Sequence, residues 1–95
     1  MTTETREDTD IRNDGKRFIT TVDGVDGYID YRREGDTMVI THTIVPDAIG
    51  GRGIAGRLTR AAFEYARDQG WKVRPECSYA AAWVERNPGF ASIIA

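Results

Sequence analysis

The sequence predicts an α/β (α+β) domain, in which a mixed, mostly antiparallel sheet of about four strands carries one helix on each face. Three observations support this fold class. β-branched and aromatic residues dominate three segments between residues 17 and 45. From residue 54 the apolar residues recur at helical spacing. A shorter strand and helix follow, so the predicted order is β-β-β-α-β-α in one domain, residues 12–95.

The first eleven residues are predicted to be a disordered tail. They consist mostly of Thr, Glu, Asp and Arg. Such a segment buries too little apolar surface to offset the entropy lost on ordering.

Three strands are expected at residues 17–22, 27–32 and 37–45. Short gaps containing Asp and Gly separate them. Gaps of this kind are typical of hairpins, so the three strands should form an antiparallel meander. Pro46 ends the third strand because it has no N–H to donate.

The second half of the chain alternates helix and strand. A core-facing helix is predicted at residues 54–69 and should end at Gly70. Residues 71–74 form a short strand, which a right-handed crossover places parallel to the third strand. A last helix, residues 79–86 with Ser78 as a candidate cap, should lie on the other face of the sheet.

Composition excludes several classes of function. The net charge of −2 gives no basic footprint for nucleic acid, and no apolar run is long enough to cross a membrane. A single cysteine cannot form an internal disulfide, which fits the cytoplasm. One histidine and one cysteine are too few for a zinc cluster, so no metal is expected. A monomer is the default expectation.

The segment from residue 50 to residue 58 (GGRGIAGRL) is the strongest functional signal. It joins a strand to a helix through a glycine-rich turn. The first N–H groups of a helix lack intrahelical partners, and the helix dipole favours an anion there. The segment therefore predicts a phosphate or pyrophosphate site, to which Arg52 and Arg57 would add charge. The alternative is an ordinary tight connection between strand and helix.

The same segment resembles the coenzyme A loop of the GNAT superfamily of N-acetyltransferases, Gln/Arg-x-x-Gly-x-Gly/Ala. Residues 50–55 match it except at Gly50, where Gln or Arg is usual. Residues 42–46 (HTIVP) and 75–79 (PECSY) are similar to features of its small YjdJ-like (acetyltransferase CG) branch. The resemblance covers roughly residues 16–90.

The resemblance implies acetyl transfer from acetyl-CoA to a primary amine, such as a lysine or peptide amine. The acceptor itself is not identified, and no metal is implied. A coenzyme A-binding module without transfer activity is the alternative. The residues expected to contact the coenzyme, in the strand and in the loop, are Thr43, Ile44, Val45, Gly50, Gly51, Arg52, Gly53, Ile54, Ala55 and Gly56.

Two residues are candidates for catalysis. Cys77 is expected at the start of the last helix, where amide dipoles favour the thiolate; it is a nucleophile, a proton donor or a small packing residue. His42 is a base, an orienting group or a packed side chain. Strand alternation puts His42 on the same face as Met38, Ile40 and Ile44. Trp83 is interpreted as core or lid packing, and Tyr79 lies too early in its helix for the superfamily's tyrosine acid.

Overall fold

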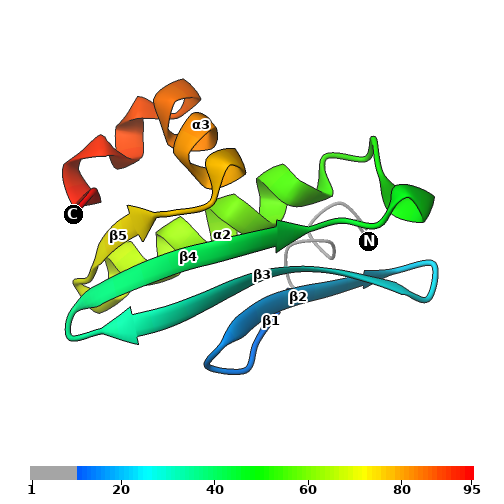
Figure 1. Ribbon diagram of the computed structural model, residues 1–95, viewed down its shortest axis with the longest axis horizontal. Coiled ribbons are helices and arrows are strands. Elements are labelled where there is room, and N and C mark those ends of the chain that lie inside the picture. Colours follow the sequence, from blue (N-terminus) through cyan, green and yellow to red (C-terminus); the bar gives the residue numbers. More distant parts are fainter. Residues whose placement is uncertain (1–10) are drawn as a thin grey trace, which may run out of the picture.

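Five strands form one sheet in the order β1-β2-β3-β4-β5 in the computed structural model, which describes residues 11–95 (Figure 1). The first three pairings are antiparallel and β4 pairs with β5 in parallel, which confirms the mixed sheet. The sheet has five strands and not the predicted four or so, because the two-residue strand β1 pairs with β2. The strands are β1 (Arg12–Asn13), β2 (Arg17–Val22), β3 (Val25–Glu34), β4 (Thr37–Ile44) and β5 (Lys72–Pro75).

Two α-helices and two short 3₁₀ helices complete the described chain. They are η1 (Asp47–Ile49), α2 (Ile54–Gln69), α3 (Ser78–Arg86) and η2 (Pro88–Ile93). None of these helices has the length and apolar character needed to cross a membrane. The predicted tail lies outside the described residues except for Ile11, which is partly buried and packs against the core.

Helix α2 lies across one face of the sheet, behind β4 in the view of Figure 1. Its buried side chains include Ile54, Leu58, Ala62 and Ala66, which recur every four residues. The facing side chains of the sheet alternate along each strand, as a half-buried sheet requires. Those buried on this side are Phe18, Ile29, Tyr31, Met38, Ile40 and Val73.

Helix α3 does not lie on the opposite face from α2, so this part of the predicted arrangement is corrected. The ring centroids of Trp83 in α3 and Phe63 in α2 are 5.2 Å apart. Phe90 of η2 also contacts Phe63, at 5.6 Å. The two helices are therefore neighbours, held together by the contacts among these three aromatic rings.

A β-bulge in β4 decides which face His42 occupies. Asp30 pairs with His42, but the next residue of β3, Tyr31, pairs with Ile40, so Thr41 has no partner on β3. One extra residue reverses the alternation of side chains. His42 therefore lies opposite the α2 face, and the prediction that it shares a face with Met38 and Ile40 is wrong.

Candidate functional site

Strands β4 and β5 separate beyond Ile40. The ladder ends at the pair Ile40–Pro75, while β4 continues to Ile44. The N–H groups of Glu76 and Cys77 both donate to the Ile40 carbonyl, at 3.0 and 3.1 Å, and the chain then turns into α3. The end of β4 consequently has no ladder bonds to β5, and the two strands are open to each other there.

Cys77 and Thr43 meet at this opening. The Sγ atom of Cys77 lies 3.2 Å from Oγ1 of Thr43, and the cysteine is half-buried. Cys77 is the N-cap of α3, with extended backbone, and Ser78 is the first helical residue. The thiol therefore stands at the N-terminal end of a helix with a hydroxyl as its polar neighbour.

His42 is not brought together with Cys77. Neighbouring residues of a strand point to opposite faces, so His42 lies on the far side of β4 from Thr43 and its sulfur contact. Its Nδ1 lies 3.1 Å from Oγ1 of Thr41 and 3.9 Å from Oδ2 of Asp30. With 66% of its side chain exposed, His42 is not a packed core residue.

The glycine-rich loop supplies a row of backbone N–H groups. Gly51 and Gly53 have φ of 76° and 73°, in the left-handed region that favours glycine. Gly53 is the N-cap of α2, and its carbonyl accepts from Arg57 N–H at 3.1 Å. Within residues 11–95, the N–H groups of residues 51–56 have no hydrogen-bond acceptor. The loop thus has the donors that an anion site needs.

The two arginines of the loop have partners within the fold. Arg52 pairs with Asp23 in the β2–β3 turn at 2.8 Å. Nη1 of Arg57 donates to the carbonyl of Arg52 at 3.1 Å. Part of the positive charge expected from Arg52 is therefore neutralised by Asp23.

Two side chains of α3 lie beside the first turn of α2, and the sequence reasoning did not assign them to the site. A Cβ atom added at Gly56 would lie 3.7 Å from the Tyr79 hydroxyl oxygen and 3.9 Å from Trp83 Nε1. Tyr79 and Trp83 are one helical turn apart and both lie near Gly56. This spacing is the feature of the sequence from which they could have been predicted. They bring an O–H and an N–H donor near the N-terminus of α2.

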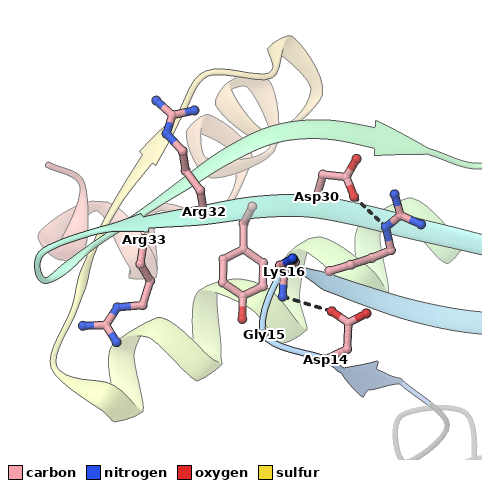
Figure 2. A pocket seen from close by; sticks show the side chains of 8 residues that line it. Asp14, Gly15, Lys16, Asp30, Arg32 and Arg33 are labelled. Carbon is pink, nitrogen blue, oxygen red and sulfur yellow. Dashed lines mark hydrogen bonds and ion pairs between the residues drawn. The ribbon is translucent and has the colours of Figure 1, made fainter.

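A separate hollow of about 530 Å³ lies where β2 begins and against β3 (Figure 2). In it, Nε of Arg17 donates to Oδ1 of Asp30 at 2.6 Å, and this hydrogen bond raises the pKa of Arg17. Burial raises the pKa of Tyr31, whose hydroxyl donates to Asn13. The hollow is lined by Asp14, Gly15, Lys16, Arg17, Asp30, Tyr31, Arg32 and Arg33.

The described residues contain no group of three or more His, Cys, Asp or Glu side chains that could hold a metal ion. The polar groups at the opening and the loop are backbone amides, hydroxyls and a thiol, and the imidazole of His42 lies on the other face of β4. Such a set suits an anionic organic ligand and proton transfer.

Known proteins resemble this chain in sequence. A model of the GCN5-related N-acetyl-transferase family matches residues 17–93. Protein NATD1 of Xenopus tropicalis is 40% identical over 52 residues, which are 55% of this chain and 48% of that protein. NATD1 of Homo sapiens is 41% identical over 49 residues, 52% of this chain and 43% of that protein. The match thus spans less than half the length of these relatives.

A solved structure has the same fold. It is the solution structure of a protein from Staphylococcus aureus described as GCN5-like, with 27% identity and a TM-score of 0.73. The similarity covers 90% of this chain and 86% of that one. Sequence match and fold agree with the resemblance carried by the loop and by residues 42–46 and 75–79. The chain belongs to the GCN5-related N-acetyltransferase family.

Proposed function

We propose that this chain is an acetyl-CoA-dependent N-acetyltransferase that acts on a primary amine, such as a lysine or peptide amine. One observation carries the proposal: the N–H groups of residues 51–56, at the start of the sixteen-residue helix α2, have no acceptor within the described chain. This row of donors lies in the loop that matches the family's coenzyme pattern.

The residues of the chain suit acetyl-CoA as co-substrate. The coenzyme would supply an acetyl thioester and a diphosphate that can be gripped. The amides of residues 51–56 would hold the diphosphate, because helix N-termini favour anions. The free edge of β4 at Thr43 and Ile44, with Val45 directly after the strand, would accept and donate hydrogen bonds along the pantetheine arm.

The reaction needs one base and one proton donor. A bond forms between the amine nitrogen and the carbonyl carbon of the thioester, and the carbon–sulfur bond breaks. The proton lost by the amine would pass to His42 if the amine approaches the open end of β4 from the face opposite α2, and the departing thiolate would take a proton on the other side. Cys77, beside Thr43 at 3.2 Å, would donate that proton or would carry the acetyl group itself before the amine does.

A coenzyme A-binding module without transfer is the second candidate. The observation that favours it is the exposure of His42, two-thirds of whose side chain faces solvent on the side of the sheet away from α2. A side chain this exposed is not enclosed by an acceptor pocket. The cytoplasm and a monomeric state remain predictions for either candidate.

Calorimetry with acetyl-CoA, coenzyme A and desulfo-coenzyme A tests the shared basis of both candidates. All three ligands should bind, because all carry the diphosphate. A turnover assay with a panel of amines then separates enzyme from binding module. Absence of binding by all three ligands would remove both candidates.

A matched pair of glycine variants tests the loop. Gly53 and Gly70 cap the two ends of α2 with nearly the same backbone, φ 73° and ψ 17° against φ 79° and ψ 21°. Gly53→Asp should weaken acetyl-CoA binding by tenfold or more, because its carboxylate would repel the diphosphate. Gly70→Asp introduces the same strain at the far end and should leave binding within about twofold. Equal losses in both variants would show that the loop is not the site.

A further inference from the structure

The bulged residue Thr41 makes two hydrogen bonds whose directions depend on each other. Its hydroxyl Oγ1 donates to the backbone carbonyl of Asp30 at 3.3 Å. The same Oγ1 lies 3.1 Å from Nδ1 of His42. Both contacts arise because Thr41 is the extra residue of the bulge and is not paired across to β3.

The chemistry of these groups decides where the histidine proton sits. A carbonyl oxygen only accepts, so the single hydroxyl proton of Thr41 is committed to Asp30. The oxygen of Thr41 can then only accept from the ring, which requires a proton on Nδ1. The Asp30 carboxylate, whose Oδ2 is 3.9 Å from the same nitrogen, favours the same arrangement.

The other ring nitrogen is left with its lone pair. Within residues 11–95, Nε2 of His42 has no hydrogen-bond partner, and the side chain is largely exposed. A neutral imidazole with Nδ1–H has its basic lone pair on Nε2. The ring therefore presents a proton acceptor on the face of the sheet opposite α2.

We infer that Thr41 is a positioning residue that holds His42 in the Nδ1–H form, so that Nε2 is the atom that takes the amine proton. The catalytic half of this inference rests on the proposed function; the placement of the proton does not. When Nε2 accepts the proton, the cation that forms keeps Nδ1–H against Thr41 and faces the carboxylate of Asp30. This is the arrangement of an oriented general base.

Nitrogen-15 NMR of the imidazole ring tests the inference directly, because His42 is the only histidine of the chain. In alkaline buffer, where a histidine ring is neutral, the wild type should give a protonated Nδ1 and an unprotonated Nε2. Thr41→Val keeps the shape of the side chain but removes the acceptor oxygen, and should abolish this preference. Thr41→Ser should restore it.

Asp30→Asn distinguishes the effect of the Thr41 hydroxyl on Nδ1 from that of the Asp30 carboxylate. This variant keeps the Asp30 carbonyl to which Thr41 donates, so the Nδ1–H form should persist. Thr21→Val is the matched control: Thr21 donates to Asp26 on the same face of the sheet and, among the described residues, makes no hydrogen bond to His42. It should leave the ring signals unchanged.

Steady-state kinetics then test whether Nε2 of His42 takes the amine proton. Thr41→Val should lower kcat by about tenfold, at the low end for a misoriented base, with the KM for acetyl-CoA within about twofold. Thr41→Ser should recover most of the loss. The inference is overturned if Thr41→Val keeps the wild-type ring signals, or if Asp30→Asn alone abolishes them. If the ring signals behave as expected but no variant or wild type turns over any amine, the proposed function fails and the placement of the proton stands.

Discussion

At the scale of single residues, Cys77 is held through its backbone and its sulfur. Its N–H donates to the Ile40 carbonyl at 3.1 Å, which ties it to the last paired residue of β4. Its Sγ lies 3.2 Å from the Thr43 hydroxyl, and its carbonyl accepts from Ala81 in the first turn of α3. The thiol is therefore positioned by β4 and the first turn of α3 together.

Cys77→Ala should reduce turnover by at least tenfold if the thiol donates a proton or carries the acetyl group. Acetyl-CoA binding, measured by calorimetry, should change by less than about twofold, because the diphosphate is held at the glycine-rich loop. Steady-state kinetics with an accepted amine give the measurement.

Cys77→Ser is the control for packing, since serine occupies a similar volume and keeps a hydrogen bond to Thr43. Unchanged turnover in both the Ala and the Ser variant would mean that Cys77 only fills space. Acetylated protein trapped before the amine is added would identify Cys77 as the nucleophile.

At the scale of elements, charged side chains cover the exposed face of the sheet where β3, β4 and β5 run side by side. In the register, Val39 lies between Arg32 and Arg74, and it is fully buried. Glu34 accepts from both arginines, at 2.9 Å from Arg32 and 3.0 Å from Arg74. Long cationic side chains can cover apolar surface while their charged ends reach a carboxylate.

These hydrogen bonds, from Arg32 first and from Arg74, lower the pKa of Glu34 below its ordinary value of 4.5. Because the pKa is lowered in the folded state, the pairs stabilise the fold above the unfolded pKa. That contribution is lost as the pH falls through the folded value. A pH titration of the Glu34 carboxyl by NMR should give a midpoint below 4.5.

Replacing Arg32 and Arg74 together by Gln should move the Glu34 midpoint back up toward 4.5. Salt at about 1 M should move it in the same direction in the wild type, because exposed pairs are screened. The same midpoint in wild type and double variant would contradict the assigned cause.

At the scale of the whole molecule, an aromatic cluster joins the C-terminal segments to α2. Phe63 is fully buried, and Trp83 and Phe90 contact it and each other, the last two at 5.6 Å. Arg60 stacks over Trp83 at 5.5 Å and donates to Asn87. Figure 1 shows α3 and η2 following β5 beyond the sheet, so the position of Cys77 depends on this cluster.

Phe63→Ala should lower the free energy of unfolding by about 3–5 kcal/mol, the usual cost of deleting a buried ring. Phe63→Leu should lower the free energy of unfolding by less, and it can still be measured if the alanine variant does not fold. Urea denaturation gives both values. Ile44→Ala, which shortens a side chain that is 40% exposed, should change stability by only about 0.5 kcal/mol. Equal losses at Phe63 and Ile44 would contradict this role of the cluster.

Local sequence patterns predicted most of the helices and strands correctly. The predicted helix over residues 54–69 matches α2, and the strand over residues 17–22 matches β2. β3 extends two residues further at each end than predicted, because its pairing with β2 and β4 continues through Val25 and Glu34. The strand β1 was missed, since two residues carry no periodicity and form a strand only by pairing with β2.

Local sequence patterns predicted only part of the candidate site. Thr43 and Cys77, 34 positions apart, were both named from sequence, but their 3.2 Å contact follows from where β4 and β5 separate. Tyr79 and Trp83 were not assigned to the site, because their nearness to Gly56 depends on how α3 packs against α2. The roles of Cys77, His42 and the loop stay predictions until they are measured.

The amino-acid order alone determined the two α-helices, four of the five strands, the glycine-rich loop and the family resemblance, because each depends on neighbours within a few positions. Only the tertiary structure decided the face on which His42 lies and the side of the sheet on which α3 packs. The first depends on one unpaired residue, Thr41, in the β3–β4 register, and the second on contacts among distant aromatic rings. Register and long-range packing minimise the energy of the whole fold, so no local pattern of residues carries them.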